Sequence, residues 1–220
     1  IIDKVSAFCD DNGIRLKLIL TLSQDTTRRI GLDTIGDLPV VDIRHEPLLY
    51  LENRLIKRII DIILSVLSII FVLLWLPLVV KIFQILTYPG PLFFIQDRIG
   101  IDGKIFRLYK FRTMKVSEEI NIAKKGQSVK TKEDDKRVPF FGRLLRSTNL
   151  DEYPQFLNVF FGSMSTVGPR PHMVGEDSIL EKNVDKYRVR RFVKPGITGW
   201  AAINGLRGGT EDMNLMKKRT

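Results

Sequence analysis

Two adjacent carboxylates, Asp151 and Glu152, lie in the run RSTNLDEYPQ at residues 146–155. One carboxylate could attack phosphorus, and the other could help to hold a divalent cation between phosphate oxygens. An aspartate has a reference pKa of about 3.9, so it is ionised near neutral pH and needs no activating base. The pair is therefore suited to phosphoryl transfer. Taken alone, however, the pair is better explained structurally, because acids in a first helical turn stabilise the helix dipole.

Basic residues around this pair favour the chemical interpretation. Lys110 and Arg112 lie in the run KFRTM, Arg146 precedes the carboxylates, and Arg170 lies between two prolines in the run GPRP. The two prolines fix the backbone of Arg170, and a rigidly held arginine loses less entropy when it binds phosphate oxygens bidentately. We therefore predict that these four basic side chains bind substrate phosphates.

A helix is expected to position the two carboxylates. The spacing from Asn149 to Glu152 fits a capping box, so the helix should begin at Thr148 or Asn149. Its apolar face is predicted from aromatic and aliphatic residues at helical spacing, which are Tyr153, Phe156, Leu157 and Phe160.

A hairpin is expected upstream of the carboxylates. The residues Gly-Ile-Asp-Gly at 100–103 are typical of a turn between short strands, the first of which includes residues 92–95. Residues 115–137 are polar and charged, which predicts an exposed loop or an insertion. The run KPGITGW predicts a Pro-Gly turn followed by an aromatic anchor, Trp200, a residue type that is enriched at membrane interfaces.

Residues 62–80 form a run of 19 residues without a formal charge, bounded by Asp61 and Lys81. One straight helix of this length would rise about 28 Å, close to the hydrocarbon thickness of about 30 Å. Pro77 would kink or stop the helix near Leu76, and because both flanks are basic, the positive-inside rule gives no preferred orientation for a crossing. A helix that breaks at Pro77 and returns to the same membrane face satisfies both observations. A buried helix of a soluble core is disfavoured, because the helix would carry apolar residues on all sides and no polar stripe.

Residues 1–56 receive no catalytic role. The runs at 14–22 and 38–43 predict strands, and the stretch at 1–11 is compatible with an amphipathic helix. No glycine-rich phosphate loop precedes a helix there, so the pattern is only that of a βα tail. Since the chain begins with Ile and without a signal peptide, we expect it to be a segment of a longer protein.

The positive charge of the chain is confined to one part. Of the formal net charge of +10, residues 1–56 contribute −2 and residues 57–220 contribute +12. Such a field suits nucleic acid, an anionic membrane surface or a phosphorylated substrate, but no nucleic-acid-binding motif accompanies it, so nucleic acid is not an expected partner. A single cysteine, Cys9, excludes a disulfide framework. The two histidines, His45 and His172, are expected to be structural or at the surface.

From Lys57 to Trp200 the chain resembles the bacterial sugar transferases, the monotopic polyprenyl-phosphate phosphoglycosyl transferases. It is most similar to the members that transfer glucose 1-phosphate to undecaprenyl phosphate. Pro139 and Ala202 depart from the family pattern, which often has threonine and glutamine there, but neither removes a proposed catalytic group. The resemblance rests on several motifs in one order, which are Lys57-Arg58 with Asp61, the turn from Arg98 to Phe106, KFRTM, RSTNLDEYPQ, residues 158–162, VGPRP and KPGITGW.

The resemblance implies a two-step reaction. Asp151 would attack the sugar-linked phosphate of a nucleoside diphosphate sugar, UDP-glucose or UDP-galactose, and form a covalent aspartyl phosphosugar. Polyprenyl (undecaprenyl) phosphate would then accept the phosphosugar, in the first step of exopolysaccharide, capsule or O-antigen synthesis. Asp151 and Glu152 would hold Mg²⁺. Arg146 and Arg170 would neutralise phosphates, with Lys110 and Arg112 as weaker candidates.

The expected fold is α+β, with a mostly helical catalytic domain, a re-entrant membrane helix and a short β-hairpin. Residues 1–56 would be the C-terminal part of an α/β nucleotide-binding-like (Rossmann-like) domain, 57–88 the re-entrant helix and linker, and 89–220 a C-terminally truncated catalytic domain. The resemblance places the site at the cytoplasmic face of the bacterial inner membrane, among membrane lipids. The alternative hypothesis is a membrane-anchored, non-catalytic binding or scaffold module that uses its polybasic surface.

Overall fold

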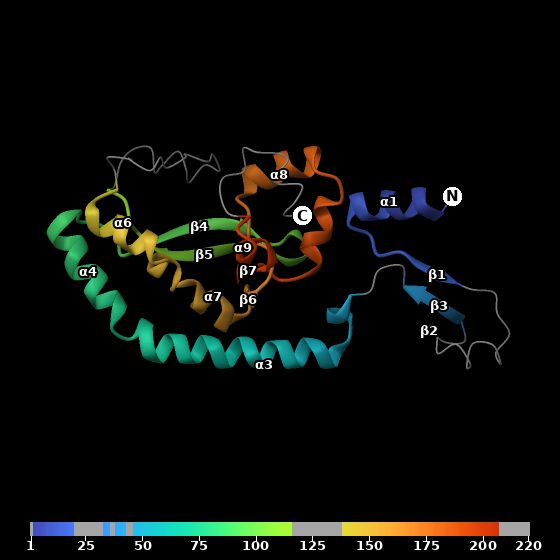
Figure 1. Ribbon diagram of the computed structural model, residues 1–220, viewed down its shortest axis with the longest axis horizontal. Helices are drawn as coiled ribbons and strands as arrows, with labels where there is room; N and C mark the ends of the chain where they lie inside the picture. Colours follow the sequence, from blue (N-terminus) through green and yellow to red (C-terminus); the bar gives the residue numbers. More distant parts are fainter. Residues whose placement is uncertain (1, 20–32, 36–37, 43–45, 116–137, 207–220) are drawn as a thin grey trace.

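The fold is known from a computed structural model that describes residues 2–19, 33–35, 38–42, 46–115 and 138–206. Within these residues, helices are mixed with short strands (Figure 1), as the α+β prediction requires. His45 and the loop or insertion expected at 115–137, apart from its first residue, lie outside the described residues.

The N-terminal part contains helix α1 (Ile2–Asn12) and strands β1 (Lys17–Ile19), β2 (Asp33–Ile35) and β3 (Leu38–Asp42). The helix and both predicted strands are therefore present, within the limits of the described residues. The strands pair antiparallel in the order β1-β3-β2. A Rossmann-like domain is built on a mostly parallel sheet, so the nucleotide-binding-like assignment of residues 1–56 is not confirmed.

A long bent arm follows, formed by a short 3₁₀ turn η1 (Pro47–Leu49), helix α3 (Leu51–Ser68), a π-helical segment η2 (Ile69–Leu73) and helix α4 (Leu76–Thr87). No single described helix is long and apolar enough to cross a bilayer. The two pieces Leu51–Leu73 and Leu76–Thr87 have the required length and composition together, and they are bent by 46° at the break between them. Pro77 lies in the first turn of α4, where its missing N–H leaves no hydrogen bond unmade. The break between Leu73 and Leu76 thus lies just before Pro77, close to the predicted position.

The predicted hairpin is confirmed as strands β4 (Phe93–Ile99) and β5 (Ile105–Phe111), joined by the turn η3 (Ile101–Gly103). Directly opposite residues of an antiparallel pair share one face of the sheet. One face of this hairpin therefore carries three facing pairs, namely Phe94 with Lys110, Gln96 with Leu108, and Arg98 with Phe106.

The remaining elements pack around this hairpin. Strands β6 and β7 form a two-stranded parallel pair, and the backbone of Gly168, directly after β6, lies close to Gly196, the first residue of β7. Trp200, the expected aromatic anchor, is 78% exposed. The elements are α6 (Phe140–Ser147), η4 (Leu150–Glu152), α7 (Gln155–Phe161), β6 (Ser165–Val167), α8 (Val174–Asn183), η5 (Tyr187–Phe192), β7 (Gly196–Thr198) and α9 (Trp200–Ile203).

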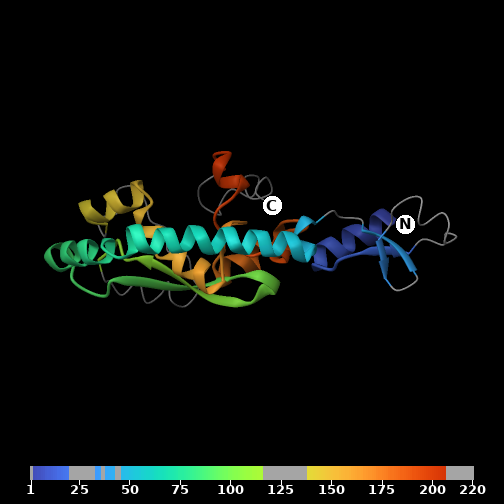
Figure 2. The same ribbon diagram turned by 90° about the horizontal axis from the view of Figure 1, so that it is seen from below.

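Polar contacts attach α3 to the rest of the molecule, and Figure 2 shows this helix running lengthwise across it. Asp61 is 3% exposed, and its Oδ1 accepts hydrogen bonds from the Thr166 backbone N–H at 2.9 Å and the Thr166 hydroxyl at 2.6 Å. The Ser165 hydroxyl donates a third bond at 3.1 Å. Arg58 donates to the carbonyls of Val159 and Phe160 at 2.7 Å each. The bonds from Arg58 and Asp61 therefore fix one side of α3 to α7 and β6.

Apolar contacts attach α4. Leu76 and Val80 of α4 pack with Phe111 of β5 and Leu145 of α6 in one buried cluster. The Gln84 amide, which is fully buried, donates to the Arg112 carbonyl at 2.9 Å. Both helices therefore have a side that faces protein, and polar residues lie on that side.

Candidate active site

The two carboxylates lie in a tight turn ahead of α7. Asn149 adopts a left-handed backbone with φ of 56°, and Leu150–Glu152 form one 3₁₀ turn. The capping-box prediction was wrong, because the Asn149 side chain makes no cap hydrogen bond and α7 begins only at Gln155, after Pro154. Asparagine tolerates the left-handed region, and proline is well accommodated just before a helix. The helix start is thereby displaced beyond the carboxylates.

Glu152 is the carboxylate that the cations hold. Lys110 Nζ lies 2.6 Å from Glu152 Oε1, and Arg170 Nη2 lies 3.7 Å from the same oxygen. Both side chains of the closer pair are mostly buried, at 19% exposure each. Burial alone would raise the pKa of Glu152, but Lys110 and Arg170 outweigh it, so the pKa lies below its ordinary value. Glu152 is therefore ionised at neutral pH.

Asp151 has a different environment. Burial raises its pKa above the ordinary value of 3.8, although Lys110 and Arg146 act in the opposite direction. Among the described residues, no cation forms a salt bridge with Asp151 within 4.0 Å. Its carboxylate is thus partly desolvated and forms no salt bridge with a cation of the described residues, which favours a nucleophile over a structural acid.

Three of the four predicted phosphate-binding cations lie around the carboxylates. Lys110 and Arg170 line the same pocket as Glu152, and Arg146 is close enough to lower the pKa of Asp151. Arg146 Nε also donates to the Thr113 hydroxyl at 2.8 Å. The Arg170 side chain is 67% exposed, and so it is open to a ligand.

Arg112 does not belong to this group, and its assignment as a phosphate-binding residue was wrong. It is 4% exposed, and its guanidinium donates to the backbone carbonyls of Tyr88 at 2.8 Å, Pro91 at 2.8 Å and Met114 at 2.6 Å. Its donors are directed to main-chain oxygens, and burial lowers its pKa. Arg112 therefore fastens the segment that leads from α4 into β4.

Two residues of the site were missed by sequence reasoning. Arg98 and Gln155 line the pocket with Glu152, and a hydrogen bond from Gln155 contributes to the low pKa of Glu152. The alternation along β4 could have identified Arg98, since it lies on the same hairpin face as Lys110. No comparable local signal marks Gln155, which is placed by the start of α7.

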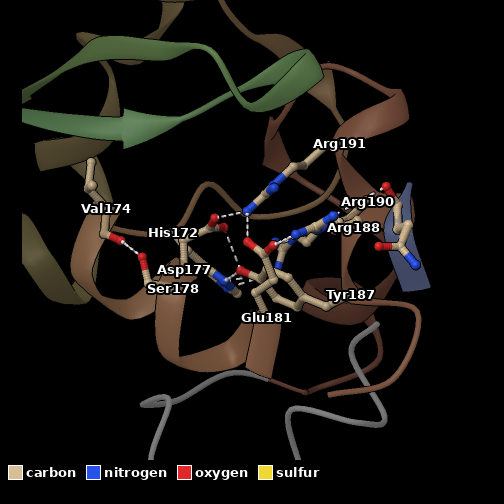
Figure 3. Close-up of polar contacts among 10 residues, drawn as sticks. His172, Val174, Asp177, Ser178, Glu181, Tyr187, Arg188, Arg190 and Arg191 are labelled. Atoms are coloured by element: carbon tan, nitrogen blue, oxygen red, sulfur yellow. Dashed lines mark hydrogen bonds and ion pairs between the residues drawn. The ribbon is translucent and has the colours of Figure 1, made fainter. Parts of the chain in front are cut away.

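A buried polar network is hydrogen-bonded to the GPRP loop, and Figure 3 shows its side chains His172, Asp177, Tyr187 and Arg190. The Tyr187 hydroxyl lies 2.6 Å from His172 Nδ1 and donates to Asp177 Oδ1 at 2.7 Å. Arg190 contacts the His172 ring at 2.8 Å and donates from Nη2 to the carbonyl oxygen of Arg170. The network therefore positions the backbone that carries Arg170, and His172 has the structural role expected for it.

Comparison with known proteins places these motifs in a family. A family model described as bacterial sugar transferase matches residues 52–220. The chain is 44% identical over 228 residues to the UDP-glucose:undecaprenyl-phosphate glucose-1-phosphate transferase of Escherichia coli (strain K12). The aligned region covers 96% of this chain and 47% of that protein.

Proteins of the same name occur among the other relatives. The one from Xanthomonas campestris pv. campestris is 38% identical over 214 residues, covering 96% of this chain and 43% of that protein. The one from Caulobacter vibrioides is 40% identical over 200 residues, covering 88% of this chain and 67% of that protein. The chain thus spans less than half of the first two relatives. The match over most of the chain, together with the motifs gathered at the pocket, shows that the chain belongs to the bacterial sugar transferase family.

Proposed function

We propose that this chain carries the catalytic site of a phosphoglycosyl transferase that moves glucose 1-phosphate from UDP-glucose to undecaprenyl phosphate. The observation that carries the proposal is the contrast between two adjacent carboxylates. Glu152 is held by Lys110 and Arg170, whereas Asp151 is partly buried and makes no salt bridge with a described cation. The names of the relatives supply the sugar, the nucleotide and the lipid acceptor.

The reaction proceeds in two displacements. A carboxylate oxygen of Asp151 attacks the phosphorus that bears glucose, the bond from that phosphorus to the bridging oxygen breaks, and UMP leaves with both electrons of that bond. An oxygen of undecaprenyl phosphate then attacks the same phosphorus and releases Asp151, which yields undecaprenyl diphosphate glucose. Lys110, Arg146 and Arg170 stabilise the negative charge on the phosphate oxygens in both steps.

The donor set is compatible with Mg²⁺. The described residues contain no cluster of three or more His, Cys, Asp or Glu side chains, but Mg²⁺ commonly uses only one or two carboxylates together with substrate phosphates. Asp151 and Glu152 would supply those carboxylates, and the bound ion would neutralise the diphosphate charge. Oxygen ligands from two acids and a diphosphate suit this hard cation.

We also propose that α3 and α4 form a re-entrant membrane segment at the cytoplasmic face of the inner membrane. The polarity of these helices is inverted relative to a soluble protein, because Asp61, Ser65 and Gln84 are buried against protein. The same helices expose many large apolar side chains, and such a surface suits lipid rather than water. The exposed apolar residues are Ile62, Ile63, Leu64, Leu67, Ile70, Phe71, Leu74, Trp75, Leu78, Ile82, Phe83, Ile85 and Leu86.

Release of UMP tests the proposed reaction. The full-length protein, incubated with radiolabelled UDP-glucose and undecaprenyl phosphate, should release UMP, and Asp151→Asn should abolish both UMP release and the labelled protein intermediate. Asp97→Asn is the matched control, because Asp97 is exposed on the other face of the hairpin. Undiminished turnover in Asp151→Asn would refute the assignment of the nucleophile. Salt-sensitive vesicle binding without UMP release from any donor would favour the non-catalytic scaffold instead.

Cysteine labelling tests the membrane arrangement. Lys17 precedes the bent arm in the sequence, Lys104 follows it, and both side chains are exposed. Each is therefore replaced by cysteine in a Cys9→Ser background. Both positions should react with a membrane-impermeant maleimide only from the cytoplasmic side. Labelling of the two positions from opposite sides would show that the arm crosses the bilayer.

A further inference from the structure

The cation Arg98 lies in the candidate active site without a role in the proposed reaction. It is on β4, and the pairing of β4 with β5 puts it on the same face of the hairpin as Lys110. Arg98 lines the pocket that Lys110, Glu152 and Arg170 also line. Three cationic side chains and a single carboxylate therefore surround this pocket.

Within the part of the chain that the structure describes, the charge of Arg98 has no anionic partner in a salt bridge. Nη1 donates to the Pro171 carbonyl at 3.1 Å, and Nη2 donates to Gln96 Oε1 at 2.6 Å. Nε is buried and has no hydrogen-bond partner among the described residues. None of the salt bridges of the described residues involves Arg98.

Burial of this charge is costly. The pKa of Arg98 falls to about 10, chiefly because burial disfavours the charged form, and Arg170 lowers it further while Glu176 and Glu152 act in the opposite direction. A cation that is largely withdrawn from water is expected to be paired, and the nearby Glu152 is already engaged by Lys110 at 2.6 Å. A ligand anion in the pocket would supply the missing partner.

We propose that Arg98 is a further phosphate-binding residue of this site, acting with Lys110 and Arg170 on a phosphate group of a substrate. The inference rests on the proposed phosphoglycosyl transfer. Two sources of phosphate are available in that reaction, the diphosphate of the donor and the monophosphate of the lipid acceptor. Arg98 also holds the Pro171 carbonyl, so the same side chain aligns the loop that presents Arg170.

A purely structural role is the competing explanation. In a purely structural role, Arg98 needs only its two hydrogen bonds to Pro171 and Gln96, and its positive charge would not contribute to substrate binding. As a phosphate ligand, the charge itself matters, so lysine should retain part of the effect although it cannot make both bonds in the same geometry. The difference between Arg98→Lys and Arg98→Gln therefore separates the two roles.

Binding is measured in an Asp151→Asn background, so that the donor is bound but not consumed. UDP-glucose is titrated calorimetrically into the full-length protein in lipid nanodiscs. Arg98→Gln should weaken binding by about 10- to 100-fold, the usual contribution of a hydrogen bond to a charged group, and Arg98→Lys should fall between Arg98→Gln and the parent. Arg107→Gln is the control, because Arg107 is exposed on the opposite face of the same hairpin, and it should change affinity by less than about twofold.

The kinetic parameters of the otherwise native enzyme identify which substrate Arg98 contacts. A rise in KM for UDP-glucose assigns it to the donor, whereas a rise confined to undecaprenyl phosphate assigns it to the acceptor. Equal losses in Arg98→Lys and Arg98→Gln, accompanied by equal falls in melting temperature, would overturn the proposal in favour of a purely structural role. Unchanged affinity and KM for both substrates in Arg98→Gln would also overturn it.

Inorganic pyrophosphate keeps this test separate from the test of the proposed function. If the Asp151→Asn parent binds no UDP-glucose but binds pyrophosphate, the donor assignment fails while the effect of Arg98→Gln on pyrophosphate still tests Arg98. Weaker pyrophosphate binding in Arg98→Gln supports the residue assignment. Absence of pyrophosphate binding in the parent contradicts a phosphate site in this pocket.

Discussion

Replacing Asp61 should detach α3 from the catalytic part of the molecule. One carboxylate oxygen, Oδ1, accepts bonds from the Thr166 N–H, the Thr166 hydroxyl and the Ser165 hydroxyl. In Asp61→Ala the Ser165 hydroxyl can still donate to the Val167 carbonyl at 3.1 Å, but the Thr166 N–H cannot rotate to another acceptor. All three bonds to Asp61 are lost, and the two from Thr166 are lost without another acceptor among the described hydrogen bonds.

Each such bond contributes about 1.5–3 kcal/mol, so the loss of the two Thr166 bonds in Asp61→Ala should lower the free energy of unfolding by about 3–6 kcal/mol. Asp61→Asn keeps an oxygen at the Oδ1 position and loses only the charge, so its cost should be about 1–2 kcal/mol. The charge matters because Arg58 and Lys194 lie nearby, and Asp61 opposes the lowering of the Lys194 pKa that burial and Arg58 cause.

The assay is chemical denaturation of the full-length protein in detergent, followed by circular dichroism. The midpoints should fall in the order wild type, Asp61→Asn, Asp61→Ala, at constant denaturant dependence. Asp97→Ala, at an exposed aspartate, should stay within about 0.5 kcal/mol of wild type. If Asp61→Ala unfolds at the same midpoint as Asp97→Ala, these hydrogen bonds do not hold α3.

Three other substitutions give separate tests. Burial raises the pKa of Asp151 and Lys110 lowers it, so Lys110→Met should raise this pKa further. Since the ionised carboxylate is the proposed nucleophile, the acid limb of the pH profile of kcat/KM should then move to higher pH. An unmoved limb would contradict this reasoning. Gly196→Ala would place a Cβ 2.0 Å from the Gly168 nitrogen, which should cost about 1–3 kcal/mol or more in denaturation experiments. Wild-type stability in this variant would contradict the observed β6–β7 pairing. Tyr187→Phe removes a hydroxyl with two buried partners, so the denaturation midpoint should fall by the equivalent of about 1–3 kcal/mol; an unchanged midpoint would show that the network behind the GPRP loop contributes no stability.

Features that depend on a few neighbouring residues could be predicted from the sequence. The hairpin at 93–111 follows from two extended runs around a Gly-x-x-Gly turn, and a proline inside an apolar run indicates a broken helix. The adjacency of Asp151 and Glu152 and the prolines around Arg170 are equally local. The predictions of the hairpin and of the helix break succeeded because backbone geometry over a few residues decides them.

Other local predictions failed because a competing local preference prevailed. Asn149 was expected to cap a helix, but it adopts a left-handed turn and the helix starts after Pro154. Arg112 and Lys110 lie two residues apart and look equivalent in the sequence. The end of β5 lies between them, so Lys110 faces Glu152 while Arg112 is directed to backbone carbonyls.

The assembly of the site was decided by the tertiary structure alone. Lys110 and Glu152 are 42 residues apart in the chain, and Asp61 meets Thr166 across 105 residues. The sequence by itself determined which residue types could bind phosphate and that an apolar helix would break near Pro77. Packing of the hairpin against α7 decided which cations reach the carboxylates, and hence which of the two acids is paired. Such pairings depend on burial and on distances between remote segments, and no local pattern in the chain encodes these distances.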